Sequence, residues 1–290
     1  MRLNKEIRLI IKRAIIEDIG REDITTLFTI PYHYKIEAII IAKENGVLCG
    51  LDVAEAIFKE HSKSIIFKPL KQEGSTFKNN ENIIYLKGDA RAILSCERVA
   101  LNFLSLLSGV ATATRNFVDK IKGTKAKILD TRKTTPNLRV LEKYAVRVGG
   151  GFNHRKRLDT AVLIKDNHLR AGKFLVDGKI DENRLSKCIL HLKKVYSLKV
   201  EVEVETYSEF LSVIKYKPDV VMLDNFSLKQ MRQAVKYRDK YYPQVKLEAS
   251  GGINLKNVRT IAKTGVDFIS IGSITHSPKA IDFSLEVLSK

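Results

Sequence analysis

Residues 200–273 carry the repeat that decides the fold: VEVEVETYSEFLSVIKYKPDVVMLDNFSLKQMRQAVKYRDKYYPQVKLEASGGINLKNVRTIAKTGVDFISIGS. Short apolar runs alternate there with patterns of helical spacing. The expected strands are 199–205, 219–223, 245–249 and 267–271, and the expected helices between them are 208–216, 228–237 and 255–264. Strands separated by helices predict a parallel sheet that is covered by those helices.

The same pattern begins further upstream, with β-rich runs expected at 127–130, 145–148 and 161–164. Seven such strands predict an α/β class protein whose second part is an incomplete, seven-stranded α/β barrel. A doubly wound open sheet is the alternative. No G-x-G-x-x-G follows the first strand, and the glycine pairs come late in the chain, where barrels bind phosphate.

The first part of the chain predicts a smaller mixed α/β unit, an open sandwich. We expect helices at 4–19 and 52–59, and strands at 34–42, around 65–66, at 82–86 and at 90–94. One long helical pattern over 97–122 then forms the seam between two domains. The predicted domains are residues 1–105, which the C-terminal segment 276–290 joins, and residues 106–275.

Charge and cysteine content limit the function classes. The 290 residues include 51 Lys and Arg against 33 Asp and Glu, a formal charge of +18. This excess fits nucleic-acid binding, an anionic small substrate or a generally lysine-rich surface. The basic residues are spread out and the three cysteines are far apart, so we expect no nucleic-acid partner, no disulfide framework and a cytoplasmic protein. The sequence contains no run of eighteen uncharged apolar residues, so we expect no membrane span.

Barrel enzymes carry their functional side chains at the carboxyl ends of the strands. Basic, imidazole and acidic residues follow the predicted strands here. Together with the hydroxyl of Thr131, they are the candidate functional residues at the strand ends: Arg132, Lys133, His154, Arg155, Lys165, Glu205 and Asp224.

The run at 200–205 alternates strictly between valine and glutamate. In a barrel, the valines meet the outer helices and Glu201, Glu203 and Glu205 point inward. Buried carboxylates need cations, and residues such as Lys165 at neighbouring strand ends are suitable. An edge strand with a solvated acidic face is the alternative.

Two glycine turns predict a phosphate site. Ser250, Gly251 and Gly252 lead towards a helix for which Asn254 is the expected N-cap, and Ile271, Gly272 and Ser273 follow the next strand. Backbone N–H groups at such turns bind phosphate. Taken one at a time, each is also explained as a tight turn that requires glycine.

Glu205 and Asp224 follow consecutive strands, and their hard oxygen ligands suit an indirectly held Mg²⁺. Lys165 also fits a Schiff-base lysine, as in aldolases, although the cations around it favour binding. No second ligand lies at metal spacing from His154 in the sequence, so anion contact or packing is expected for it.

Together the motifs closely resemble the quinolinate phosphoribosyltransferase family. The resemblance rests on ordered motifs between about Gly88 and Ser273: ERVALN (97–102), SGVAT (108–112), TRKTTP (131–136), GGGFNHR (149–155), IKDNH (164–168), EVET (203–206), LDN (223–225) and SGGI (250–253). The first eighty residues match more loosely.

The resemblance implies the type II phosphoribosyltransferase fold and a homodimer, or a higher oligomer, in which Arg98 crosses to the partner's site. It implies that quinolinate and phosphoribosyl pyrophosphate react, with Mg²⁺, to give nicotinate mononucleotide, pyrophosphate and CO₂ in de novo NAD synthesis. Cations at the other strand ends then surround the quinolinate carboxylates. Lys133, Glu205 and Asp224 take the catalytic roles, and the two acids face the ribose and the metal.

Two departures from the family pattern stand out. Asn137 replaces a frequent glycine, and asparagine tolerates left-handed backbone. The segment 170–183 is longer than usual and predicts a surface hairpin. A related transferase acting on another aromatic acid, a Schiff-base aldolase and a basic nucleic-acid-binding protein remain the competing hypotheses.

Overall fold

The computed structural model describes residues 3–176 and 179–288, and the chain divides into two compact units. Unit 1 consists of Met1–Arg115, Lys133–Gly150 and Ser273–Lys290. Unit 2 consists of Asn116–Arg132 and Gly151–Gly272. The boundaries of these units differ from those of the predicted domains, 1–105 and 106–275. The two domains stay a prediction.

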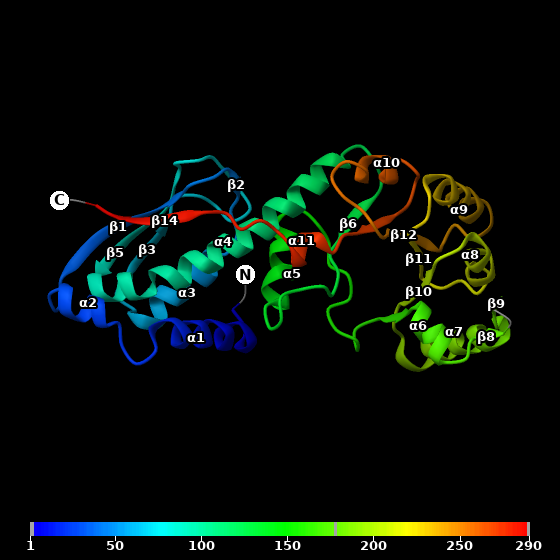
Figure 1. Ribbon diagram of the computed structural model, residues 1–290, viewed down its shortest axis with the longest axis horizontal. Helices are drawn as coiled ribbons and strands as arrows, with labels where there is room; N and C mark the ends of the chain where they lie inside the picture. The colour runs from blue at the N-terminus through cyan, green and yellow to red at the C-terminus, as the bar shows by residue number, and fades with distance from the viewer. Residues whose placement is uncertain (1–2, 177–178, 289–290) are drawn as a thin grey trace. The chain divides into compact units, whose positions relative to one another are not determined.

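An antiparallel sheet of four strands organises unit 1 (Figure 1). Its order is β14 (Phe283–Val287), β1 (Lys35–Ala42), β5 (Asn82–Asp89) and β3 (Ile66–Pro69). The three strands predicted at 34–42, 65–66 and 82–86 are confirmed. Strand β14 brings a C-terminal segment into this sheet through its pairing with β1. A short antiparallel pair is formed by β2 (Gly46–Val47) and β4 (Thr76–Phe77).

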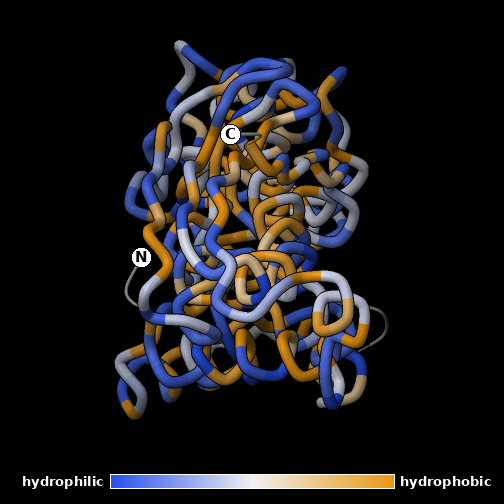
Figure 2. Tube along the Cα trace, turned by 90° about the vertical axis from the view of Figure 1, so that its left-hand side faces the viewer, coloured by the Kyte–Doolittle hydropathy of each residue, from blue (hydrophilic) through white to orange (hydrophobic). Residues whose placement is uncertain are grey.

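Four helices accompany this sheet: α1 (Lys5–Ile19), α2 (Ile24–Thr29), α3 (Leu51–His61) and α4 (Ala90–Lys120). Hydrophobic residues concentrate towards the middle of the trace in Figure 2, while the outer loops are mostly hydrophilic. Burial of these apolar side chains is the main stabilising contribution to unit 1. The helices predicted at 4–19 and 52–59 are confirmed.

The strand predicted at 90–94 is wrong, because α4 already begins at Ala90. The Asp89 side chain accepts a hydrogen bond from the Ala92 N–H at 3.0 Å, which satisfies a donor at the start of the helix. By length and composition α4 could cross a membrane, but 61% of its most apolar window is buried inside the protein. It is therefore built as a core helix.

Unit 2 contains a parallel sheet of six strands in the order β6 (Lys127–Leu129), β13 (Phe268–Ser270), β12 (Lys246–Ser250), β11 (Val220–Asp224), β10 (Val200–Val204) and β7 (Val162–Ile164). A single parallel bridge joins Phe152 to Leu129 on the free side of β6. The α/β class and the incomplete barrel are thus confirmed, but the seventh strand is reduced to this one bridge.

The strand predicted at 145–148 is the one that is missing, because these residues end helix α5 (Arg139–Val148). Leu141, Ala145 and Val146 are buried at helical spacing, so the β-branched residues at the end of this segment misled the prediction. Just before α5, Asn137 has φ +66°, the left-handed conformation expected of it.

Helices connect the strands of unit 2: α6 (Asp166–Ala171), α7 (Glu182–Tyr196), α8 (Tyr207–Ile214), α9 (Leu228–Tyr241) and α10 (Val258–Ala262). Figure 1 shows α8, α9 and α10 along the outer side of the strands. A hairpin of β8 (Leu175–Val176) and β9 (Lys179–Ile180) confirms the expectation for 170–183, although its turn at 177–178 lies outside the described residues. The short α11 (Ser273–His276) follows β13.

Candidate active site

The carboxyl ends of the parallel strands meet at one edge of unit 2, and Lys165 stands at the end of β7. Its ammonium nitrogen lies 2.5 Å from Glu203 Oε2 on the neighbouring strand β10. Glu203 is buried, whereas the Lys165 side chain is 43% exposed. The pair thus places a cation at the mouth of the barrel above a buried carboxylate.

Burial raises the pKa of the Glu203 carboxyl, the charge of Lys165 opposes that rise, and the nearby Asp224 carboxylate adds to it. The backbone N–H of Lys165 donates to His168 Nδ1 at 3.0 Å, so His168 serves the start of α6. Because Lys165 is held as an ion pair, the geometry favours a binding cation over a free amine nucleophile.

The prediction that the acidic face of β10 points into the barrel is confirmed for Glu201 and Glu203, which are 6% and 8% exposed. The side chain of Glu205, just beyond the strand, is 49% exposed, and its Oε2 lies 3.8 Å from Arg170 Nη2. The register pairs Val204 with Leu223, so Glu205 and Asp224 follow at the same level of the sheet.

The segment around His154 occupies the place of the missing strand and is tied to Asp130 at the end of β6. Asp130 Oδ1 accepts the His154 N–H at 2.9 Å, and Oδ2 accepts from Asn153 Nδ2 at 2.5 Å. Asp130 is fully buried. No role for Asp130 was predicted, although an acid at the end of the expected strand 127–130, directly before Thr131, was the available signal.

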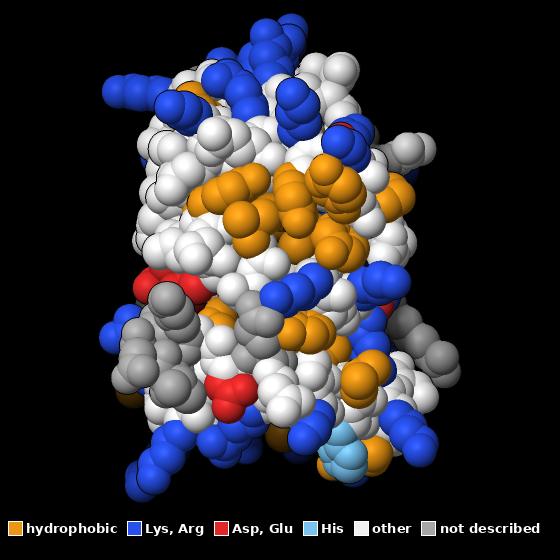
Figure 3. Space-filling model, turned by 90° about the vertical axis from the view of Figure 1, so that its right-hand side faces the viewer, with side chains coloured by type: hydrophobic (Ala, Val, Ile, Leu, Met, Phe, Trp, Pro, Cys, Tyr) orange, Lys and Arg blue, Asp and Glu red, His pale blue; other side chains and the backbone are white. Residues whose placement is uncertain are grey.

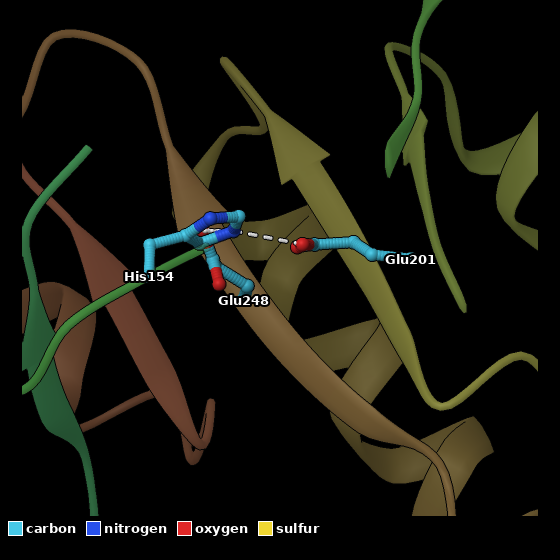
Figure 4. A group of neighbouring side chains, drawn as sticks. All are labelled: His154, Glu201 and Glu248. Carbon is cyan, nitrogen blue, oxygen red and sulfur yellow. Dashed lines mark hydrogen bonds and ion pairs between the residues drawn. The ribbon is translucent and has the colours of Figure 1, made fainter. Parts of the chain in front are cut away.

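His154 points inward to two glutamates (Figure 4). Its Nε2 lies 2.8 Å from Glu201 Oε2 and 3.8 Å from Glu248 Oε1, which comes from β12. Glu248 is 1% exposed and was missed by the sequence analysis, which read 245–249 only as a strand. The predicted contact of this histidine with an anion therefore has a defined form, a bond to a buried carboxylate of the protein.

Arg155 follows His154 and remains a candidate for substrate binding. Its Nη1 donates to the Ala161 carbonyl at 3.2 Å. Burial lowers the pKa of Arg155, the neighbouring Arg132 charge adds to this, and Glu201 and Glu203 oppose it. Arginine stays protonated despite such shifts, so Arg132 and Arg155 form a close pair of fixed positive charges.

The predicted phosphate residues of unit 2 follow two paired strands, β12 and β13. Gly251 and Gly252 have φ of +90° and +60°. A Cβ on Gly251 would clash with the side-chain oxygen of Asn225 and approach its backbone nitrogen to 3.0 Å, so glycine is required at position 251. Ile271 donates its N–H to the Leu129 carbonyl at 3.0 Å, and Gly272 follows it.

The prediction of Asn254 as the N-cap is wrong, because α10 begins only at Val258. The Asn254 side chain instead accepts from the Lys256 N–H at 2.9 Å within the preceding turn. The glycine turn itself, and not a helix start, is thus the candidate phosphate site.

The remaining site residues are placed as follows. Thr131 and Arg132 are half-buried beyond β6 in unit 2. Arg98, Lys133 and Ser273 belong to unit 1, where Arg98 and Lys133 are exposed. The Lys133 carbonyl accepts from Thr275 Oγ1 at 2.6 Å. The approach of these three residues to the unit 2 residues stays a prediction.

Comparison with known proteins shows the family to which this chain belongs. Models of the quinolinate phosphoribosyl transferase N-terminal and C-terminal domains match residues 23–108 and 110–286. The chain belongs to the quinolinate phosphoribosyltransferase family. The nicotinate-nucleotide pyrophosphorylase (carboxylating) of Mycobacterium leprae is 38% identical over 282 residues, which cover 96% of this chain and 95% of that one.

Solved structures of the family agree over the full length. The nicotinate-nucleotide pyrophosphorylase of Francisella tularensis has a TM-score of 0.90 and 41% identity, with 99% of this chain and 98% of that chain covered. The Ehrlichia chaffeensis protein of the same name has a TM-score of 0.88 and 36% identity, with 99% and 100% covered. The resemblance inferred from the sequence motifs is confirmed.

Proposed function

We propose that this quinolinate phosphoribosyltransferase family member transfers phosphoribosyl from phosphoribosyl pyrophosphate to quinolinate. The products are nicotinate mononucleotide, pyrophosphate and CO₂, a step of de novo NAD synthesis. The observation that carries the proposal is the match of both family domains over nearly the whole chain, with a cationic cluster at the strand ends.

The reaction requires the protein to orient the two substrates and to stabilise charge with fixed charged groups. Displacement at the anomeric carbon passes through an oxocarbenium-like state as the C–O bond to pyrophosphate breaks and the bond to the pyridine nitrogen forms. The ring nitrogen becomes cationic and stabilises the electron pair left on the adjacent ring carbon when its carboxylate leaves as CO₂. A proton from water then binds to that carbon. Such steps are accelerated by fixed charges and alignment, and no protein nucleophile is required.

Quinolinate carries two carboxylates, and the cluster of unit 2 is suited to them. Arg132, Arg155 and Lys165 are fixed cations that lie near one another through Glu203, which faces both Lys165 and Arg155. Arginine binds carboxylates through two parallel hydrogen bonds. We assign these three residues, with Thr131 beside them, to quinolinate, and the Ser250–Gly252 and Ile271–Ser273 turns to the phosphate. Both ring nitrogens of His154 are bonded within the protein, so its part in quinolinate binding is through its neighbour Arg155.

Mg²⁺ is part of this proposal, with Glu205 and Asp224 as the residues that hold it indirectly. Two carboxylates at the same level of adjacent strands supply the hard oxygen ligands that the ion prefers, and Glu205 is exposed to solvent and substrate. Bound Mg²⁺ would neutralise charge on the pyrophosphate group. Removal of Mg²⁺ with a chelator should abolish turnover, and added Mg²⁺ should restore it.

We also propose a homodimer, with higher oligomers open, in which Arg98 of the partner subunit completes the quinolinate site. Arg98 is exposed on α4, although its neighbours Val99 and Ala100 are buried, so its charge is available to another chain. Arg98→Ala and Lys133→Ala should each be inactive yet folded. If the site is shared, mixed and re-equilibrated variants should regain about a quarter of wild-type activity.

No recovery on mixing, with hybrid dimers verified by two different affinity tags, would place Arg98 and Lys133 in the same site of one chain. Wild type taken through the same mixing procedure is the control for losses.

A cytoplasmic location and the absence of a nucleic-acid partner complete the proposal. All three cysteines are free thiols. On the face in Figure 3, Lys and Arg side chains gather towards the upper and lower edges, with apolar and uncharged side chains across the middle. A continuous basic surface, which nucleic-acid binding favours, is not present on that face.

The direct test is product formation. Purified protein incubated with Mg²⁺, phosphoribosyl pyrophosphate and quinolinate should form nicotinate mononucleotide, whereas nicotinate in place of quinolinate should give none. Product from nicotinate or another pyridine acid alone would support the related transferase instead. Absence of product from quinolinate, with the protein shown to be folded, would refute the proposal.

A further inference from the structure

A buried cluster of three titratable side chains lies inside the barrel of unit 2, apart from the cations that face the substrate. His154, Glu201 and Glu248 bring one ligand atom each to within 4.8 Å of one another (Figure 4). The two glutamates come from β10 and β12, and the histidine comes from the segment that replaces the seventh strand. None of the three side chains is more than 11% exposed.

The glutamates cannot both be ionised at low cost. Oε1 of Glu201 and Oε1 of Glu248 are buried and have no hydrogen-bond donor among the described residues. Two carboxylates this close in a buried site repel each other strongly, and one of them then binds a proton. Burial raises the pKa of Glu248 well above its usual range, and the charge of Glu201 adds to the rise. A proton or a metal cation bound between the two carboxylates would remove this repulsion.

The hydrogen bonds of His154 decide between a proton and a metal. Nδ1 accepts the backbone N–H of Arg155 at 2.8 Å, so the ring proton of neutral His154 is on Nε2. That Nε2–H then donates to Glu201 Oε2 at 2.8 Å. A histidine that binds metal through Nε2 would carry its proton on Nδ1, directed against the Arg155 N–H, and metal-bound histidines normally donate that proton instead.

We propose that these three side chains form a hydrogen-bonded cluster with one negative charge, in which neutral His154 and neutral Glu248 both donate to the Glu201 carboxylate. Its role is to position the neighbouring Arg155 for substrate. The protonation state of the cluster is independent of catalysis, whereas the positioning of Arg155 rests on the proposed function.

The positioning role follows from how the segment 152–155 is held. Asp130 and the bridge to Leu129 fix its backbone on one side, and the His154 ring fixes it to the barrel interior. The Arg155 N–H is itself bonded to that ring. Rotation of His154 would therefore release the backbone that carries the Arg155 guanidinium.

The charged and polar groups around Glu248 come from the neighbouring strands and from the segment that follows His154. Glu203 lies beside Glu201 on β10, Ser270 faces it from β13, and Arg155 follows His154. A cavity of about 270 Å³ next to the cluster is also lined by Lys127 and Lys199. The charge of Glu201 in turn acts on Arg155, the cation that follows the cluster along the chain.

The protonation is tested without turnover. Unfolding should release about one proton more from wild type than from Glu248→Gln near neutral pH, because an unfolded glutamate is ionised there. Glu60→Gln, an exposed acid, should release as many protons as wild type. Should Glu248→Gln fail to fold, the infrared band of a protonated carboxyl in folded wild type at neutral pH decides. Equal proton release, or no such band, overturns the proposal.

The positioning role is tested by charge-selective variants. The side-chain amide that Glu248→Gln introduces can donate to Glu201 as a neutral acid does, so this variant should keep kcat and KM within about twofold. Glu201→Gln removes the acceptor charge and should raise the KM for quinolinate about tenfold or more, with a smaller effect on the KM for phosphoribosyl pyrophosphate. Equal losses in both variants contradict the proposal. The proposal is also contradicted if purified wild type contains one equivalent of bound metal and Glu248→Gln contains none.

The experiments distinguish failure of the proposed function from failure of the proposed cluster of His154, Glu201 and Glu248. If wild type does not convert quinolinate, the proposed function fails, while the proton count still decides the charge of the cluster.

Discussion

At the residue scale, the site is built from ion pairs that keep cations in fixed places. Lys165 lies over the buried Glu203, and Arg155 lies near Glu203, Glu201 and Arg132. The side-chain types and their places at strand ends followed from the sequence. The partner of each did not, because Glu201, Glu203 and Glu205 share one period-2 pattern and only the barrel geometry separates their roles.

Loss of the Lys165 charge should be costly for catalysis and mild for folding. We expect Lys165→Met to lower kcat/KM for quinolinate about 100-fold, because a fixed cation is removed and Glu203 then binds a proton more readily. Steady-state kinetics measures the effect, with Lys229→Met, an exposed lysine on α9, as the matched control. Activity within a few-fold of wild type would exclude Lys165 from the substrate site.

At the element scale, most strands of unit 2 could be predicted because buried parallel strands read as short apolar runs between helical patterns. The segments 90–94 and 145–148 failed for one reason. Each is a short apolar run inside a longer helix, and such a run has no periodicity of its own. The start of α10 was misplaced because an asparagine after two glycines caps a turn as readily as a helix.

One buried ion pair joins α9 to β12 and β13. Arg238, which is 2% exposed, donates to Asp267 Oδ2 at 2.5 Å and to the Val245 carbonyl at 2.8 Å. Arg238→Met would leave Asp267 only its longer contacts with Lys125 and Lys246, at 3.8 and 3.5 Å, and would remove the donor to the Val245 carbonyl. We therefore expect the free energy of unfolding to fall by about 3 kcal/mol. Urea unfolding measures it. Arg232→Met on the exposed side of the same helix should change it by less than about 0.5 kcal/mol.

The same pair has a defined pH dependence. Burial tends to raise the pKa of Asp267, but the Leu247 N–H and Arg238 outweigh it and hold the pKa below its usual value. The stabilisation is therefore complete above the unfolded pKa and is lost as the pH falls through the lower folded pKa. The stability difference between wild type and Asp267→Asn should shrink below about pH 4; a constant difference would contradict this assignment.

At the scale of the whole molecule, the two units and their order along the chain were open to prediction, because the family motifs span both. The grouping of residues 133–150 with unit 1 was not, since it depends on contacts between residues distant in sequence. The formal charge of +18 is explained only locally: the substrates proposed for Arg132, Arg155 and Lys165 are polyanions, and the other lysines add long-range attraction at most.

Thiol reactivity reports on the packing of both units. Cys49 and Cys96 are fully buried, and burial raises the pKa of both, that of Cys96 to about 12. Cys188 on α7 is half-buried. A thiol reagent should thus label about one cysteine in the native protein and all three in denaturant. Rapid native labelling of all three would show that unit 1 opens easily, and Cys188→Ser should remove the native signal.

The central claim is a phosphoribosyl transfer that ends in decarboxylation, and one stoichiometry tests it most directly. Quinolinate labelled with ¹³C in the carboxylate next to the ring nitrogen is incubated with the protein, phosphoribosyl pyrophosphate and Mg²⁺, and labelled CO₂ and pyrophosphate are counted. The account predicts one labelled CO₂ for each pyrophosphate. Pyrophosphate released without CO₂, or neither product from folded protein, would contradict it.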